Sequence, residues 1–371
     1  MPLPTPRFWY RRRPSWQARL LTPAGLLYAL AVRLHRTCSQ PLRLPVPVVS
    51  VGNITLGGTG KTPLVLALAR ELAARGLRPA VLTRGYGSGR RQPLLVRPDL
   101  PVEMVGDEAL ELAAGLAPLG VPVWAGSDRA TAAHQALAAG AELLLLDDGL
   151  QHWRLARDCD VTVLDAVQRL GNALPFPAGP LRETAPALGR ADLLVLTGQG
   201  DLRPGGLPWP AERPWLAVSS TIALPEALLD RPLLAFCGIG LPEKFFQALR
   251  QRGCHLVGEE VFPDHHPYAQ EDLERLLARA RGSARPKTTA VPTRTPAGGT
   301  DGSTPATLVT TVKDWQRLAP LLDRAPHPAP DTPVVVPVPL ELDAGAVGRL
   351  TEAVLAQLAH RSPDLTARRH G

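Results

Sequence analysis

The sequence predicts an α/β fold in which a doubly wound, mainly parallel sheet is joined to a second, smaller α/β domain and preceded by an N-terminal amphipathic helix. Three features indicate this fold: a glycine-rich turn between an apolar run and a helical segment, a run of leucines that ends in aspartate, and a repeated alternation of apolar runs with helical segments. Such alternation is typical of parallel sheets with helices on both faces. A chain of 371 residues is also long enough for two domains.

The glycine-rich turn lies between residues 46–51, which read as a buried strand, and residues 63–72, which read as a helix. This strand–turn–helix order is the context that a phosphate-binding P-loop requires. Thr55 replaces the first glycine of the usual motif, and a turn without any ligand is the plain alternative. The agreement of motif and context favours a P-loop NTPase-like domain whose nucleotide-binding residues are Thr55, Gly57, Gly58, Thr59, Gly60, Lys61 and Thr62.

The residue types in this loop suit a bound phosphate. Glycines let backbone N–H groups approach an anion, and the start of the helix adds aligned donors. Lys61 would reach the β- and γ-phosphates of a nucleotide, and the Thr62 hydroxyl would bind Mg²⁺. Lysine is rare among the 41 Lys and Arg residues, which favours a specific use of the compact Lys61 ammonium group; the four lysines are Lys61, Lys244, Lys287 and Lys313.

A second nucleotide-binding signal is the run of four leucines at residues 143–146, which is followed by Asp147 and Asp148. A buried parallel strand of this kind delivers a carboxylate to Mg²⁺ at its C-terminal end, as in a Walker B motif. A turn with a helix cap would explain the same residues, but the P-loop upstream favours the functional interpretation. Other strands are expected at residues 77–83, 121–124, 161–165 and 194–197, and a helix is expected at residues 128–139.

Two short motifs carry further candidate residues. Residues 105–109 open a helix and place Asp107 and Glu108 in its first turn, where Asp107 by itself would be read as a helix cap. His265 and His266 lie in the loop FPDHH, and on the sequence alone they would be interpreted as a surface pair.

The chain is expected to divide into four parts. Residues 1–40 form a basic, membrane-interacting segment with a helix, and residues 41–225 form the P-loop domain. Residues 226–340 form the smaller α/β domain, and residues 341–371 form a C-terminal helix and tail. Within the smaller domain, residues 282–306 have few large apolar side chains, so we expect a disordered insertion there.

Charge is unevenly placed along the chain. The net charge is +7, yet residues 1–70 hold ten basic side chains and no acidic ones, so the rest is nearly neutral. This distribution excludes a uniformly basic nucleic-acid binder and points to a cationic N-terminal end. The four cysteines show no metal-ligand spacing, and reduced, mostly buried thiols in a cytosolic protein are expected.

The N-terminal segment interleaves arginines with aromatic residues before an apolar stretch at residues 20–32. Thr22 and Pro23 predict the start of a helix, with an N-cap followed by proline at the first helical position. The stretch is too short to span a membrane, which takes about 20 apolar residues, and residues 33–36 are no signal-peptide cleavage site. A helix lying in the membrane interface is favoured over an ordinary helix packed on the core.

These motifs together resemble one family, the tetraacyldisaccharide 4'-kinases, which are also called lipid A 4'-kinases. The resemblance runs from Trp16 to Val338 in the order SVGNITLGGTGKTP, LTRGYG, GDEA, LLDDGLQHWRL, LPFPAGPLRE, AFCGIGLPEKFF, FPDHH and TTVKD. Two pieces depart from the family pattern: TTVKD has Val312 where Glu is usual, and GDEA replaces GDEP.

The resemblance implies a kinase that uses ATP and Mg²⁺. It would transfer the γ-phosphate to the 4'-hydroxyl of a lipid substrate, tetraacyldisaccharide 1-phosphate, to give lipid IVA in lipid A biosynthesis. It also implies an active site in a cleft between the domains. The implied location is the cytoplasmic face of the bacterial inner membrane, where the protein would be peripheral or monotopic.

The family pattern also assigns roles to residues of this chain. It implies that Asp107 is the catalytic base, that His265 pairs with it to orient the carboxylate and carry the proton away, and that Lys61 acts on the phosphates. Thr62 with Asp147 or Asp148 would hold Mg²⁺. Candidates with weaker or undecided roles in metal, substrate or nucleotide binding, or in structure, are Glu183, Glu108, Gln151, His152, Arg84, Asn172 and His266.

Three other functions compete with this one. A dimerising, membrane-associated P-loop ATPase switch would have its signature lysine at position 56, which is leucine here. A soluble small-molecule kinase would not explain the cationic, tryptophan-bearing N-terminus. A non-catalytic nucleotide-binding scaffold would have no use for Asp107, Asp147 and His265.

Overall fold

The computed structural model describes residues 6–11, 13–89, 91–198, 202–282, 305–323 and 333–361. The described residues form two compact units: those between 222 and 340 belong to the smaller one, and those at 6–221 and 341–361 belong to the larger one. The expected insertion at residues 282–306 lies almost wholly outside the described residues. Strands β9 (Ser220–Ile222) and β14 (Leu340–Leu342) pair where the chain enters and leaves the smaller unit.

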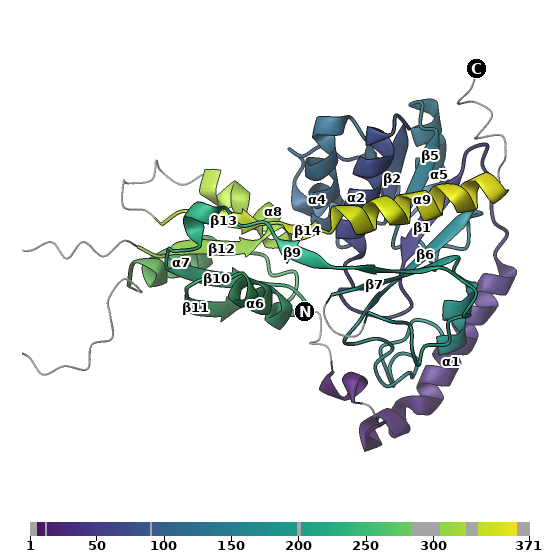
Figure 1. Ribbon diagram of the computed structural model, residues 1–371, viewed down its shortest axis with the longest axis horizontal. Helices are drawn as coiled ribbons and strands as arrows, with labels where there is room; N and C mark the ends of the chain where they lie inside the picture. The colour runs from purple at the N-terminus through teal and green to yellow at the C-terminus, as the bar shows by residue number, and fades with distance from the viewer. Residues whose placement is uncertain are drawn as a thin grey trace, which may run out of the picture. The chain divides into compact units, whose positions relative to one another are not determined.

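The larger unit is built on an eight-stranded sheet (Figure 1) with the order β3-β4-β2-β5-β1-β6-β7-β8. All neighbours in it run parallel except the pair of β3 and β4. The prediction of a doubly wound, mainly parallel sheet is therefore confirmed. The strands are β1 (Val48–Gly52), β2 (Pro79–Thr83), β3 (Leu94–Leu95), β4 (Val123–Ala125), β5 (Leu143–Asp147), β6 (Cys159–Asp165), β7 (Leu193–Thr197) and β8 (Trp215–Val218).

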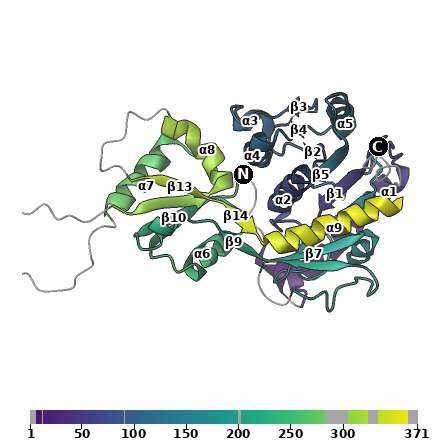
Figure 2. The same cartoon turned by 45° about the horizontal axis from the view of Figure 1, so that its top comes forward.

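Helices cover both faces of this sheet because its strands are apolar on both sides. Leu145 packs into the cluster made with α2 (Lys61–Ala74), α4 (Asp107–Leu116) and α9 (Ala344–Arg361). Its neighbours Leu144 and Leu146 point to the other face and pack against α5 (Arg129–Ala138). Figure 2 shows α9 running beside α2, which it contacts. Short helices complete the unit at α3 (Val102–Val105), η2 (Ala117–Leu119) and η3 (Ala185–Arg190).

The smaller unit holds a four-stranded, fully parallel sheet with the order β11-β10-β12-β13. Its central strands are again apolar on both faces: Phe236 packs with α7 and α8, whereas Cys237 packs with α6. The elements are β10 (Leu233–Cys237), β11 (Leu256–Val261), β12 (Thr307–Thr311), β13 (Val335–Val338), η4 (Glu226–Leu228), α6 (Pro242–Gln251), α7 (Gln270–Gly282) and α8 (Val312–Asp323).

The N-terminal helix differs from its prediction. Helix α1 spans Trp16–Cys38, so the expected start at Thr22 and Pro23 is wrong. The Ser15 side chain caps the helix by accepting from the Ala18 N–H at 3.3 Å. Pro23 is the eighth residue of the helix, in its third turn, where it costs a backbone hydrogen bond without ending the helix. The Thr22 hydroxyl, expected as a cap, instead donates to the Ala18 carbonyl at 2.9 Å.

The N-terminal segment packs on a loop of the larger unit, residues 172–183. Trp9, in η1 (Arg7–Tyr10), is buried and donates from its indole nitrogen to the Pro177 carbonyl at 3.0 Å. Phe176 makes edge contacts with the rings of Trp9 and Tyr28. Gly25 is buried in α1, where a side chain would come within 2.9 Å of the Pro175 carbonyl. Within the described residues, no helix is both long and apolar enough to span a bilayer.

Gly106 provides a test of a backbone constraint beside the candidate site. It has φ +86° and ψ 152°, a region almost restricted to glycine, and a Cβ there would lie 2.3 Å from the Tyr86 carbonyl oxygen. We expect Gly106→Ala to lower the free energy of unfolding by about 3 kcal/mol or more. Gly76→Ala is the matched control, since Gly76 also has positive φ but open space around it; about 1–2 kcal/mol is expected there. Urea unfolding measures both, and equal losses would contradict the steric argument.

Candidate active site

The P-loop connects the end of β1 to the first residue of α2, as the sequence predicts. Gly57 and Gly60 have φ values of +107° and +80°, which a residue with a side chain rarely adopts. The Asn53 amide donates to the Thr59 hydroxyl at 3.1 Å, and the Thr197 hydroxyl of β7 donates to the Thr59 carbonyl at 2.8 Å. Residues at the ends of β1 and β7 therefore hold the conformation of the loop through hydrogen bonds to Thr59.

Residues 180–182 hold the other side of the P-loop. The Leu56 N–H donates to the Pro180 carbonyl at 2.7 Å, and the Arg182 N–H donates to the Ile54 carbonyl at 2.8 Å. Thr55 is buried and forms a bridge with Leu181. The Thr55 side chain, at the position of the usual first glycine of the motif, is therefore packed within the protein, where its hydroxyl accepts from the Asn53 amide at 3.4 Å.

The Walker B strand ends beside the P-loop. Strand β5 pairs with β1 so that Asp147 is opposite Val51. Asp147 is 1% exposed, and one of its carboxylate oxygens accepts from the Thr83 hydroxyl at 3.0 Å. Asp148 has a left-handed backbone with φ 48°, which turns it out of the strand. Its carboxylate lies 3.8 Å from the Lys61 ammonium nitrogen.

The two aspartates have opposite electrostatic environments. Burial, and then the negative charges of Glu108 and Asp148, raise the pKa of Asp147 to about 7. Burial also acts to raise the pKa of Asp148, but Lys61 and Arg182 outweigh it and lower that pKa to about 2. Asp148 is therefore an anion at neutral pH, while Asp147 is only partly charged there, and a bound cation would favour its charged form.

The surroundings of Asp147 fit a divalent cation. Its second carboxylate oxygen, Oδ1, is buried and has no hydrogen-bond partner, and a buried acceptor without a partner is costly. Thr62 is the second residue of α2, directly after Lys61. In the part of the chain that the structure describes, no three His, Cys, Asp or Glu side chains gather as a ready-made metal cage. Mg²⁺ in nucleotide sites needs only one or two protein oxygens, because phosphate and water supply the rest.

Sequence reasoning did not single out two arginines that hold this edge of the sheet. The Arg182 guanidinium contacts both carboxylate oxygens of Asp148, at 2.7 and 2.8 Å. Arg129 is buried at the start of α5 and donates to the main-chain carbonyls of Asp147 and Asp148 at 2.7 and 3.1 Å. Arg182 lies within the quoted motif LPFPAGPLRE, so its signal was present, whereas nothing in the sequence around Arg129 marks it.

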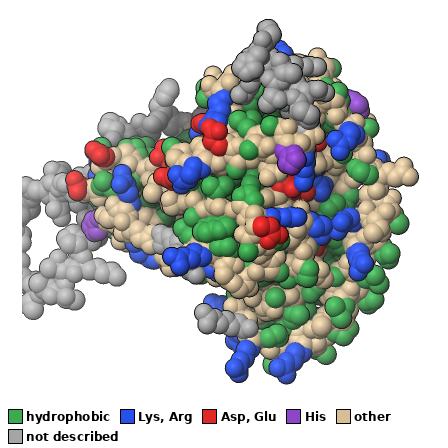
Figure 3. Space-filling view, turned by 45° about the vertical axis from the view of Figure 1, so that its right-hand side comes forward, with side chains coloured by type: hydrophobic (Ala, Val, Ile, Leu, Met, Phe, Trp, Pro, Cys, Tyr) green, Lys and Arg blue, Asp and Glu red, His purple; other side chains and the backbone are tan. Residues whose placement is uncertain are grey.

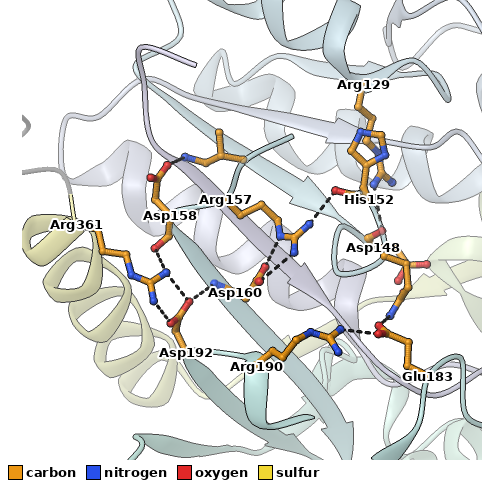
Figure 4. A network of polar contacts seen from close by, with 12 residues as sticks. Arg129, Asp148, His152, Arg157, Asp158, Asp160, Glu183, Arg190, Asp192 and Arg361 are labelled. Carbon is orange, nitrogen blue, oxygen red and sulfur yellow. Dashed lines mark hydrogen bonds and ion pairs between the residues drawn. The ribbon is translucent and has the colours of Figure 1, made fainter. Parts of the chain in front are cut away.

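The loop after β5 links these groups to the P-loop. Gln151 donates from its amide nitrogen to the Asn53 carbonyl at 3.1 Å and to Glu183 at 3.0 Å. Glu183 is buried and also forms an ion pair with Arg190 at 2.6 Å (Figure 4). Both of its carboxylate oxygens are therefore engaged with protein. Burial, and then the positive charge of Arg129, lower the pKa of His152 to about 3, so that ring is neutral.

A second set of ion pairs, Arg157 with Asp160 and Arg361 with Asp192, connects this loop to β6 and α9 (Figure 4). Arg157 donates to the His152 carbonyl at 2.8 Å and pairs with Asp160 on β6 at 2.7 Å. Asp192 accepts from the Asp160 N–H at 2.8 Å and pairs with Arg361, the last residue of α9, at 2.6 Å. The C-terminal helix is thereby connected to the segment that carries Gln151 and His152.

The remaining predicted residues fall in two places. Asp107 is buried in the first turn of α4, where it accepts from the Glu108 N–H at 3.0 Å, and Arg84 is exposed after β2. Asn172 is structural, because its amide donates to the Ala178 carbonyl at 2.9 Å and its oxygen accepts from the Leu174 N–H. His265 and His266 lie in the smaller unit. There His266 lies 2.8 Å from Asp272, as expected for a structural residue.

This combination of a P-loop with an aspartate at the end of the neighbouring parallel strand defines a P-loop phosphotransferase fold. Comparisons with known proteins agree. A family model described as tetraacyldisaccharide-1-P 4'-kinase (LpxK) matches residues 17–359. The crystal structure of LpxK from Aquifex aeolicus in complex with ATP has a TM-score of 0.65 to this chain, with 25% identity over 92% of this chain and 99% of that one.

Curated relatives named tetraacyldisaccharide 4'-kinase give the same result. One from Bradyrhizobium sp. (strain BTAi1) is 38% identical over 371 residues, covering 96% of this chain and 97% of that protein. Another, from Gluconacetobacter diazotrophicus, is 46% identical over 281 residues, covering 74% of this chain and 83% of that protein. The chain therefore belongs to the tetraacyldisaccharide-1-phosphate 4'-kinase family, as its motifs predict, and it is a kinase.

The opposite environments of the two aspartates predict opposite effects of neutralising them. Because its folded-state pKa is raised, Asp147 weakens folding increasingly as the pH rises from about 4 to about 7. We expect Asp147→Asn to stabilise the nucleotide-free protein at pH 8 by about 1 kcal/mol or more, and to lose most of that advantage by pH 5.

Asp148→Asn is the matched control. The pKa of Asp148 is lowered, so its contribution to stability is complete above about pH 4 and is lost only toward pH 2. This variant should be about 2 kcal/mol less stable than the wild type at both pH 5 and pH 8. Urea unfolding at the two pH values checks both variants, and effects of the same sign at pH 8 would contradict the assignment.

Proposed function

We propose that this protein transfers the γ-phosphate of ATP to the 4'-hydroxyl of tetraacyldisaccharide 1-phosphate. The observation that supports this most directly is Lys61, at the start of α2, paired with Asp148 beside the buried Asp147 in a chain of this family. Related LpxK from Aquifex aeolicus was crystallised with ATP. The product would be lipid IVA, made at the cytoplasmic face of the bacterial inner membrane.

The nucleotide would be held by the P-loop amides and by Lys61. In the structure the Lys61 ammonium group is 3.8 Å from Asp148, a distance that leaves it able to turn toward phosphate. Arg182 would keep the Asp148 charge balanced when Lys61 turns away, since it contacts both carboxylate oxygens. Thr62 and Asp147 would hold Mg²⁺. The ion would place positive charge beside the negative charge that develops on the phosphates during transfer.

Asp107 is our candidate for the base that accepts the proton of the 4'-hydroxyl. It is 3% exposed, and it stands in the first turn of α4, which also carries Glu108. The N-terminal end of a helix favours a negative charge at this position, and a positioned carboxylate can act as a general base. His265 is proposed, from the family pattern, to orient that carboxylate. If the two act together, the double variant Asp107→Ala/His265→Ala should be no slower than the slower single variant.

The N-terminal helix is our candidate for the membrane-binding element. Large apolar side chains on α1 remain exposed, including Trp16 at 71%, Leu20 at 72% and Leu27 at 69%. Figure 3 shows hydrophobic side chains, in green, mixed with Lys and Arg side chains, in blue, on the side of the larger unit where α1 lies. Apolar groups flanked by arginines suit an interface of anionic headgroups.

Phosphoryl transfer is tested by mass spectrometry of the lipid after incubation with Mg-ATP and detergent-dispersed tetraacyldisaccharide 1-phosphate. The wild type should add one phosphate. Asp107→Ala should lower kcat by about 10²–10⁴ while ATP binding survives, because only proton transfer is lost. Lys61→Ala should abolish ATP turnover. Asp99→Ala, at an exposed aspartate, is the control and should be fully active.

Two outcomes of this assay would oppose the proposal. Unchanged transfer by Asp107→Ala would remove its role as base. ATP hydrolysis by the wild type without a phosphorylated lipid would favour the rival function, a membrane-associated ATPase switch, which family membership does not support.

Membrane binding is tested by flotation with vesicles that contain anionic lipid. Replacing Leu27 and Leu30 with Gln should weaken binding at least about tenfold, because each buried leucine contributes about 1.5–3 kcal/mol. Leu119→Gln is the control, since Leu119 is exposed elsewhere on the larger unit. Binding that survives the double change would show that another surface attaches the protein.

A further inference from the structure

The loops at one end of the smaller sheet are tied together by a buried aspartate. Strands β10, β11 and β12 are parallel, so their C-terminal ends lie at the same edge. Asp314, which follows β12, is fully buried and accepts from the Gly238 N–H at 3.0 Å, the Tyr268 hydroxyl at 3.0 Å and the Thr311 hydroxyl at 2.7 Å. Arg317 completes this cluster with contacts to Asp314 and to the His266 carbonyl.

The same cluster fixes the backbone of His265. This residue has φ 59°, a left-handed conformation that is uncommon outside glycine. Its N–H donates to the Gly238 carbonyl at 3.1 Å, and Gly238 is itself held by Asp314. The loop after β11 therefore has little freedom, and the imidazole starts from a defined position.

Lys313 lies next to Asp314 and contacts the ring of His265. Its ammonium nitrogen is 3.2 Å from His265 Nε2. The Asp264 carboxylate oxygen Oδ1 is 3.9 Å from the same atom, beyond hydrogen-bond distance, and it is buried without a hydrogen-bond partner among the described residues. Both Lys313 and His265 are partly buried, so the contact is shielded from bulk water.

We infer that Lys313 is a positioning residue that fixes the tautomer of His265, with the ring proton on Nδ1. An ammonium group can only donate, so the Nε2 atom that faces it must be an acceptor and must lack a proton. A neutral ring then carries its one proton on Nδ1. The neighbouring Asp314 cluster keeps Lys313 and His265 at this distance.

This inference rests on the proposed function for its consequence in catalysis. A ring with Nδ1–H is a hydrogen-bond donor at Nδ1 and can orient a carboxylate acceptor. It cannot take a proton at Nδ1, which already has one, and its Nε2 is held by Lys313. His265 would therefore act as a hydrogen-bond donor rather than carry the proton away, which is a sharper role than the family pattern implies.

The test reads the tautomer directly, by ¹⁵N–¹H correlation spectra of the imidazole rings in the full-length protein. His265→Gln identifies the His265 signals among those of the nine histidines. The wild type should show His265 as the Nδ1–H tautomer. In Lys313→Met the proton should move to Nε2, where Asp264 can accept it. Lys244→Met, at an exposed lysine, is the control and should leave the ring unchanged.

A wild-type ring that is protonated at Nε2, or at both nitrogens, would overturn the inference whatever the activity shows. Enzyme kinetics provides a second test. Lys313→Met should lower kcat at least about tenfold with the KM for ATP unchanged. Lys313→Arg, which keeps a hydrogen-bond donor, should recover part of that loss. Failure of the proposed function can be told apart from failure of this inference. In that case the wild type would not phosphorylate the lipid, but its spectrum would still show the Nδ1–H tautomer of His265.

Discussion

The ion cluster at the end of β5 is the constraint on which the rest of the larger unit's site depends. Asp148 lies between the Lys61 ammonium and the Arg182 guanidinium, and the Arg129 guanidinium holds its main-chain carbonyl. One anion thereby fixes the P-loop lysine and the segment before Glu183. Asp147 is buried beside this cluster, and the negative charges of Glu108 and Asp148 add to the effect of burial on its pKa, which is the condition that suits a metal ion.

The loop at residues 172–183 connects this cluster to the N-terminal segment. One end of the loop supplies Arg182, and its middle packs against Trp9 and Tyr28. Trp153 reinforces the same connection, since the guanidinium groups of Arg36, in α1, and Arg190 lie over its ring at 5.6 and 5.3 Å. The helix proposed to bind the membrane and the residues proposed to bind the nucleotide therefore both contact the loop at residues 172–183.

Much of the fold was predictable, because apolar runs and helical segments alternate clearly, and the P-loop and Walker B residues follow from local motifs. The start of α1 was not, because Thr22 and Pro23 resemble a helix start and only packing decides otherwise. Ser15 caps the helix and Gly25 fits against Pro175, so the helix continues through the proline. Ser15 and Thr22 are both possible N-caps in the sequence, and the packing of the helix on the loop at residues 172–183 determines which of them is used.

The sequence by itself determined the fold class, the nucleotide-binding loop and the family, because each depends on residues that are close together in the chain. Only the tertiary structure decided the partners of those residues. Arg129 reaches the Asp147 carbonyl at the end of β5, and Lys313, in the first turn of α8, reaches His265 in the loop after β11. Charge pairs between distant segments leave no periodic pattern in a sequence, since they depend on where strand ends meet. For the same reason, the sequence alone could not predict that the adjacent residues Asp147 and Asp148 have different charge states.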